Sequence, residues 1–104
     1  MMKSNELEPK SDYTIQTFND VKLSVVVAFE RTGTDVKNIE NIVTDLMLEF
    51  SHVNTNDILQ AIRNGGLGMY GKTYKLTTQE ICIWIRTYLK ENSPVKAFHP
   101  TIYD

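Results

Sequence analysis

The 104-residue sequence has little of what builds disulfide-bonded or membrane-spanning proteins. Its single cysteine, Cys82, cannot form an internal disulfide bond, which agrees with a reducing compartment. Its longest apolar run, residues 25–29, falls far short of the roughly 20 residues that cross a bilayer, and its polar first residues lack the apolar stretch of a signal peptide. We therefore expect a cytoplasmic protein with no membrane partner.

Residues that bind metals or carry out catalysis are also scarce. His52 and His99 are the only histidines, and neither belongs to a zinc-binding pattern, so we expect no metal site and no cofactor. Cys82 lies in an apolar stripe and is interpreted as a small core or boundary residue rather than a nucleophile. We therefore predict a protein that is not an enzyme and has no catalytic residues.

The composition is that of one globular domain, with 41% hydrophobic and 23% charged residues. Residues 1–12 have almost no apolar side chains and are expected to form a mobile N-terminal tail. Residues 13–93 are expected to form a single helical domain. Pro94 is expected to end the last helix, so that residues 94–104 form an extended C-terminal segment.

The spacing of apolar residues predicts a helix over about 35–50, with Asp35 as its N-cap. Steps of three and four place seven side chains on one face of this helix. These are Val36, Ile39, Ile42, Val43, Leu46, Met47 and Phe50.

Two further helices are predicted in the second half of the chain. One begins after Asn54, whose side chain can accept hydrogen bonds from the backbone amides of the first turn. It ends where Gly65 or Gly66 adopts a left-handed conformation. The other spans about 78–91, and Thr77 stands at capping-box spacing before an acidic residue. Its apolar stripe contains Ile81, Trp84, Ile85, Tyr88 and Leu89.

Residues 21–29 fit two structures. Their odd-numbered apolar positions alternate as in a strand, whereas a helix capped by Asp20 and stopped by Gly33 also accounts for the pattern. A single strand would have no partner in the rest of the sequence, which favours the helix. The prediction is a compact four-helix, all-α domain with a long glycine-rich loop between the last two helices.

The segment from residue 65 to 76, GGLGMYGKTYKL, holds four of the five glycines. Residues 66–73 match the phosphate-binding pattern G-x-x-x-x-G-K-[ST]. That pattern requires a buried strand before it and a helix directly after the lysine, whereas a predicted helix precedes it here and a new helix cap follows it. The match therefore does not favour nucleotide binding, which stays a distant third hypothesis.

A structural interpretation of this loop is sufficient for most of its residues. Gly68 and Gly71 supply backbone conformations that other residues resist. Four apolar residues are expected to anchor the loop in the core, namely Leu67, Tyr70, Tyr74 and Leu76.

The charge distribution supports a second role for the loop, because residues 61–90 carry five basic side chains against the single acidic Glu80. Lysine and threonine can hold phosphate oxygens, and tyrosine can stack on an unpaired base. The predicted contact residues for nucleic acid or a partner are Arg63, Tyr70, Lys72, Thr73, Tyr74, Lys75, Arg86 and Lys90.

Residues 58–89 contain a helix, a G-x-x-G-x-Y-G-x-x-Y loop and a helix with W-I-x-x-Y. These motifs are Gly65, Gly68, Tyr70, Gly71 and Tyr74, followed by Trp84, Ile85 and Tyr88. The stretch resembles small uncharacterised proteins of Bacteroidota phages and mobile elements, some of which accompany replication genes. The resemblance covers about a third of the chain and implies a nucleic-acid or replication-protein partner.

The sequence therefore predicts a non-enzymatic accessory protein of a phage or mobile element that binds DNA or a DNA-replication partner through the basic, tyrosine-containing loop. The alternative is a protein-interaction module, with a homodimer as one form, that uses the last helix and the C-terminal segment. Cys82 and Ile83 favour this alternative because they add apolar area to the last helix outside its main stripe.

Overall fold

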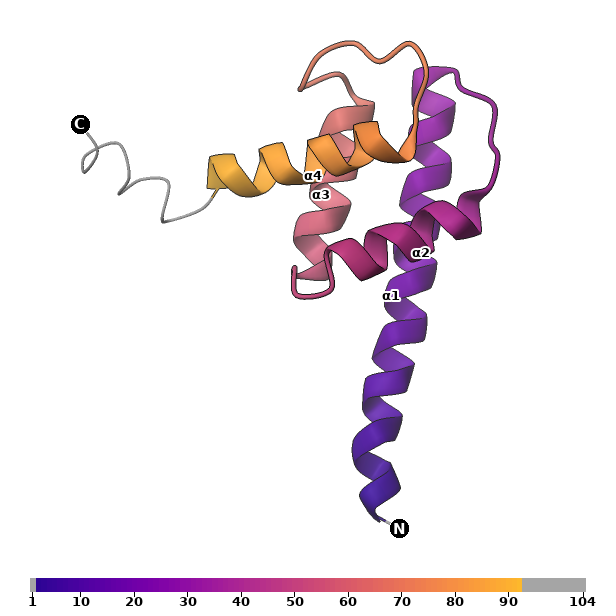
Figure 1. Cartoon of the computed structure of the whole chain (residues 1–104), viewed down its shortest axis with the longest axis vertical. Coiled ribbons are helices and arrows are strands. Elements are labelled where there is room, and N and C mark those ends of the chain that lie inside the picture. The colour runs from indigo at the N-terminus through magenta and orange to yellow at the C-terminus, as the bar shows by residue number, and fades with distance from the viewer. Residues whose placement is uncertain (1, 93–104) are drawn as a thin grey trace, which may run out of the picture.

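The computed structural model describes the backbone of residues 2–92 and the side chains of residues 15–92. The described chain is all-helical and contains α1 (Met2–Thr32), α2 (Ile39–Glu49), α3 (Thr55–Gly66) and α4 (Thr78–Asn92). The predicted all-α fold is confirmed. In Figure 1, α1 and α3 run side by side in one layer, and α2 and α4 cross in front of them.

The ends of the chain leave two expectations untested. The backbone of residues 2–12 forms the first turns of α1, which extend beyond the other helices in Figure 1, and the mobility of this segment stays a prediction. The C-terminal segment, residues 94–104, lies outside the described residues. The domain limits of residues 13–93 likewise stay a prediction.

Residues 21–29 are helical, which confirms the favoured interpretation of this segment. Val21 and Val25 are completely buried, whereas Leu23 is 65% exposed. A strand would place all three side chains on one face, while a helix separates them, so burial follows the helical period of 3.6 residues.

The predicted ends of α1 had opposite outcomes. The helix continues through Asp20, so the expected cap there is wrong. Phe18, which precedes Asp20, also packs against the core, so the buried face of the helix begins before Asp20. Gly33 ends the helix as expected, with a φ of 72°. The Thr34 N–H donates to the Phe29 carbonyl at 2.9 Å and the Gly33 N–H to the Glu30 carbonyl at 3.2 Å, which is a Schellman motif.

The start of α2 is later than predicted. Asp35 is not the N-cap: that position belongs to Asn38, which adopts a left-handed φ of 51°. Val36 precedes the helix and is 48% exposed, so its expected place on the buried face is also wrong. Residues 34–38 are needed to carry the chain from one layer to the other. The rest of the stripe is confirmed, with Ile42, Val43, Leu46 and Phe50 buried.

The predicted N-terminal caps of α3 and α4 are confirmed. The Asn56 N–H donates to the Asn54 side-chain oxygen at 2.9 Å, and the Glu80 N–H donates to the Thr77 hydroxyl at 3.2 Å. Both are interactions between residues two or three apart, so the local sequence is enough to specify them.

The glycines at the end of α3 have different roles from those predicted. Gly65 and Gly66 are helical, and the left-handed residue after the helix is Gly68, with a φ of 85°. The Met69 N–H donates to the Asn64 carbonyl at 3.0 Å in a second Schellman motif. Gly65 instead allows close packing, because a Cβ there would overlap the indole ring of Trp84. The need for glycine at this position comes from α4 rather than from the end of α3.

Candidate contact surface on the loop between α3 and α4

The loop between α3 and α4, residues 67–77, is fixed at its first half by local hydrogen bonds. The Gly68 N–H donates to the Gly65 carbonyl at 3.0 Å, and the Gly71 N–H donates to the Gly68 carbonyl at 3.1 Å. The side chain of Asn64 donates to the Tyr70 hydroxyl at 3.2 Å. Tyr70 is half-buried and packs against the core, as expected.

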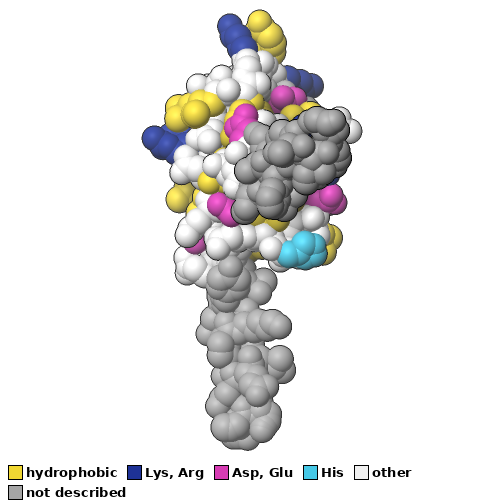
Figure 2. Space-filling model, turned by 90° about the vertical axis from the view of Figure 1, so that its left-hand side faces the viewer, with side chains coloured by type: hydrophobic (Ala, Val, Ile, Leu, Met, Phe, Trp, Pro, Cys, Tyr) yellow, Lys and Arg dark blue, Asp and Glu magenta, His cyan; other side chains and the backbone are white. Residues whose placement is uncertain are grey.

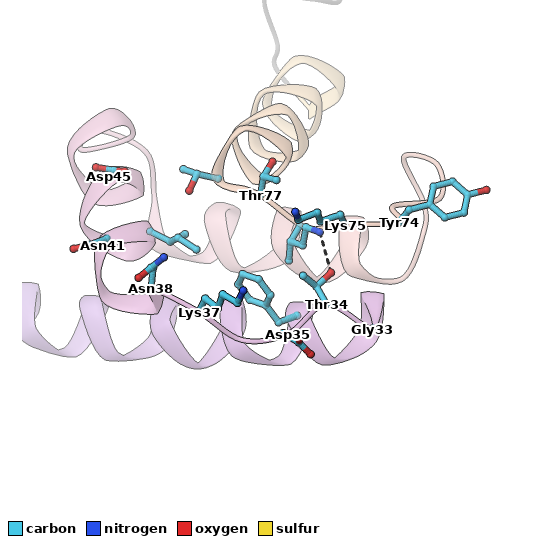
Figure 3. Close-up of a pocket in the computed structure, with 14 residues that line it drawn as sticks. Gly33, Thr34, Asp35, Lys37, Asn38, Asn41, Asp45, Tyr74, Lys75 and Thr77 are labelled. Carbon is cyan, nitrogen blue, oxygen red and sulfur yellow. Dashed lines mark hydrogen bonds between the residues drawn. The ribbon is translucent and has the colours of Figure 1, made fainter.

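The second half of the loop is fastened to the end of α1. The Leu76 N–H donates to the Thr34 hydroxyl at 2.9 Å, a bond shown dashed in Figure 3. The Thr34 hydroxyl lies 2.9 Å from that of Thr32, which donates to the Ala28 carbonyl at 3.0 Å. Leu76 itself is buried, as predicted. The two fixed ends leave the part of the loop between them as its exposed tip.

Two of the four expected loop anchors are wrong. Tyr74 is 80% exposed and Leu67 is 52% exposed. Figure 3 shows the Tyr74 ring pointing away from the body of the protein. The space under the loop is already filled by Leu76 and Tyr70, so the remaining apolar side chains of the loop face outward.

The loop tip presents an aromatic ring together with positive charge. The Lys72 ammonium lies 5.1 Å from the centre of the Tyr74 ring, within cation–π distance. Lys72 and Lys75 are exposed and form no ion pair within the described residues. Residues 64–79 contain no acidic side chain. At this end of the molecule, Lys or Arg and hydrophobic side chains project next to each other (Figure 2).

A cleft of about 680 Å³ opens beside the loop, between the α1–α2 connection, the start of α2 and the start of α4. Lys75 and Lys37 both line it, as do Asp35 and Asp45 (Figure 3). The sequence alone did not place Lys37 beside Lys75, because the two residues are 38 positions apart in the chain. The cleft is lined by both positive and negative side chains. The exposed loop, in contrast, carries only positive ones.

The structure does not gather all of the predicted contact residues. Five of them lie together on the loop because they are close in the chain, namely Tyr70, Lys72, Thr73, Tyr74 and Lys75. Whether these five residues contact a ligand stays a prediction.

The three basic residues predicted on the helices lie elsewhere. Arg63 lines a shallow hollow between α1 and α3, where Arg31 also lies. Arg86 pairs with Glu49 of α2 at 2.9 Å, and Lys90 lies near the end of α4 that is farther from the loop (Figure 1). The candidate contact surface is therefore the loop itself, and Arg86 and Lys90 face a different part of the protein.

Residues 66–73, which match the phosphate-binding pattern, do not lie in the structural setting of a nucleotide site. Gly66 is the last residue of α3, so a helix precedes the pattern, and Lys72 lies six residues before the first residue of α4. The loop therefore does not feed its lysine into the first turn of a helix, as the phosphate-binding motif does.

The single cysteine lies at the edge of the core on α4. Burial raises the pKa of the Cys82 thiol above its ordinary value, Arg86 lowers it, and Glu49 and Asp45 raise it. A raised pKa disfavours the thiolate, which is the nucleophilic form. Within residues 15–92 no group of three or more histidine, cysteine, aspartate or glutamate side chains could hold a metal ion.

Comparisons with known proteins return no relative for this chain. No protein-family model, curated protein or solved structure matches it significantly. No helix among the described residues is long and apolar enough to cross a membrane.

Proposed function

We propose that the protein is a non-enzymatic accessory protein that binds DNA, or a partner in DNA replication, through the loop between α3 and α4. The observation that carries this proposal is the exposed Tyr74 ring, held next to Lys72 at 5.1 Å on a loop without acidic side chains. An aromatic ring stacks on an unpaired base, and neighbouring lysines neutralise phosphates. This combination is typical of contacts with single-stranded nucleic acid.

The fixed ends of the loop support the proposal. Hydrogen bonds from Asn64 to Tyr70 and from Leu76 to Thr34 hold the loop on both sides of its tip. A loop that is ordered before binding loses less conformational entropy when it binds. The resemblance of residues 58–89 to proteins of phages and mobile elements agrees with an accessory role beside replication genes, in the cytoplasm.

Fluorescence anisotropy of labelled oligonucleotides tests this function directly. The full chain is titrated into single-stranded and double-stranded DNA at low salt, where phosphate contacts are strongest. We expect binding to single-stranded DNA that weakens as salt rises. Absence of binding to both forms at low salt would exclude DNA as the ligand.

A second candidate function is a protein-interaction module that uses α4. The specific observation is the exposure of Ile83 on α4, at 51%, beside Leu48 on α2, at 73%. Exposed apolar side chains that share a hollow are typical of a protein interface. The C-terminal part of this alternative lies outside the described residues. Loss of an identified protein partner on Ile83→Asp, with the fold retained by circular dichroism, is the expected result, and unchanged binding would exclude α4 as the contact.

A further inference from the structure

The outer face of α2 and α4 is defined here by the residues of both helices that line the hollow between them, and it has an apolar centre. Leu48 contributes from α2 and Ile83 from α4, and both are more than half exposed. Cys82 lines the same hollow and is half-buried. Among residues 15–92, no other segment covers these two side chains.

Charged side chains surround this centre, with acids on one helix and a base on the other. Arg86 of α4 pairs with Glu49 of α2 at 2.9 Å, and each side chain stays more than half exposed. Asp45 lies one turn before Glu49, is exposed, and forms no ion pair within the described residues. All three line the hollow. The face is therefore acidic along α2 and basic on α4.

We propose that this face forms a symmetric homodimer, an inference that names the partner for the interaction function above. A two-fold rotation places α2 of one copy against α4 of the other. Leu48 of each copy then packs on Ile83 of the other, and Asp45 reaches Arg86 across the interface.

Charge complementarity favours a second copy over an unrelated protein. A partner for this face must offer an apolar centre and a base opposite Asp45, because Arg86 is already paired with Glu49 of its own chain. The face itself supplies both, because a two-fold rotation exchanges its acidic and basic sides. Opposite charges therefore meet twice in one symmetric contact.

The size of the face sets the strength of this dimer. With 11 residues in α2 and 15 in α4, the helices are about 16 and 22 Å long and each is about 10 Å wide. The face covers about 400 Å² per copy, or about 800 Å² in total, which is below the roughly 1,200 Å² of standard interfaces. We therefore expect a weak dimer, with a dissociation constant of about 10 to 500 µM.

Sedimentation equilibrium of the full chain from about 1 µM to about 1 mM, a range chosen to bracket that constant, tests the proposal. The average mass is expected to rise from 12.0 kDa towards twice that value. Leu48→Asp and Ile83→Asp are each expected to weaken association about tenfold or more, since each places a charge in the apolar centre. A wild-type chain that stays monomeric over the whole range would overturn the homodimer.

A matched control comes from α1. Leu23 is 65% exposed, so Leu23→Asp introduces the same charge at a similarly exposed position on another face. It is expected to leave association unchanged. A loss of association with Leu23→Asp but not with Leu48→Asp would place the interface elsewhere and reject the proposal. Circular dichroism of each variant confirms that it remains folded.

Mixing two charge variants tests the pairing across the interface. Asp45→Lys and Arg86→Glu each bring like charges together in their own dimers, so each alone is expected to associate less than the wild type. In a mixed dimer the introduced lysine of one copy faces the introduced glutamate of the other, and the native Asp45 faces the native Arg86, so an equimolar mixture is expected to recover association. A mixture that associates no better than its components rejects this geometry.

The same variants separate this inference from both proposed functions. DNA binding by the loop is expected to be unchanged in Leu48→Asp, because Leu48 does not belong to the loop. A monomeric wild-type chain that loses a different protein partner on Ile83→Asp would reject the homodimer while retaining the interaction function.

Discussion

Gly65 of α3 lies directly against the indole ring of Trp84 of α4, so closely that a Cβ at position 65 would overlap the ring. Trp84 is 1% exposed and is among the largest fully buried side chains. This contact sets how closely α3 and α4 approach, and α4 follows directly on the loop that we propose as the contact surface.

Gly65→Ala is expected to destabilise the protein by about 3 kcal/mol, because the buried ring cannot move without disturbing the core. Chemical unfolding followed by Trp84 fluorescence measures the change. Gly66→Ala is the matched control, since a Cβ there meets only ordinary contacts at 3.5 Å or more. The control is expected to be neutral or stabilising by up to about 1 kcal/mol. Equal effects at both positions would show that the close contact is not what requires glycine.

The bond between Leu76 and Thr34 gives a second prediction. Thr34→Val removes the hydroxyl that accepts from the Leu76 N–H at 2.9 Å and leaves this part-buried donor without its acceptor. The expected loss of stability is about 1 to 2 kcal/mol, measured by thermal or urea unfolding. Thr34→Ser keeps the hydroxyl and is expected to stay within about 0.5 kcal/mol of wild type. Equal losses in the two variants would mean that this hydrogen bond does not fasten the loop.

The lysines of the loop are expected to determine the salt dependence of DNA binding. Neutralising two phosphates of single-stranded DNA gives a slope of about −1.4 in a plot of log affinity against log salt. Lys72→Ala with Lys75→Ala is expected to remove most of that slope. Arg86→Gln with Lys90→Gln is the control, because these side chains lie along α4 and away from the loop. A larger loss in the control pair would move the contact to α4.

Tyr74 is expected to contribute by stacking. Tyr74→Ala should weaken binding to single-stranded DNA by about 5- to 150-fold, corresponding to roughly 1 to 3 kcal/mol per stacked base. Tyr74→Phe keeps the ring and is expected to bind nearly as well as wild type. Since the side chain is 80% exposed, neither change should alter unfolding. If the alanine variant binds as well as the phenylalanine variant, stacking has no part in binding.

The Cys82 thiol provides a prediction about pH. Because burial raises its pKa, less thiolate is present at a given pH than for free cysteine, and alkylation by iodoacetamide should be slower and rise at higher pH. Glu49→Gln removes a charge that raises this pKa and should speed alkylation at fixed pH. Arg86→Gln removes a charge that lowers it and should slow alkylation. Opposite signs would show that these side chains do not face the thiol in solution.

The same shift affects stability at alkaline pH. The pKa of the Cys82 thiol is higher in the folded protein than in the unfolded chain. Its contribution to the free energy of unfolding is therefore fully present at pH values below the pKa of the unfolded chain, and it is lost as pH rises through the pKa of the folded protein.

The helical faces could be predicted from the sequence, and particular residues show why. Val21 and Val25 are buried while Leu23 is exposed, as the spacing of a helix requires. Asn54 and Thr77 cap their helices through bonds to residues two or three positions away. Each of these outcomes depends on neighbours in the chain, so the local pattern contains the necessary information.

The candidate site could be predicted only in part. The lysines and tyrosines of the loop are visible as a pattern, but Tyr74 was expected in the core and is exposed. Arg86 was expected as a contact residue on the last helix, and it pairs with Glu49, which is 37 residues earlier in the chain. Which side chain fills the space under a loop, and which charge finds a partner, depends on elements that meet only in the folded protein.

The sequence by itself determined the helices, their buried faces and most of their caps, because hydrogen bonds and the helical period act over a few residues. Only the tertiary structure decided what each glycine does. Gly68 turns the chain after α3, while Gly65, three residues earlier, makes room for Trp84 of another helix. The tertiary structure also decided that Tyr74 and Lys72 form an exposed tip and that Leu48 lies beside Ile83. The physical reason is that close approach and exposure depend on how two layers of helices cross, which no short stretch of sequence contains.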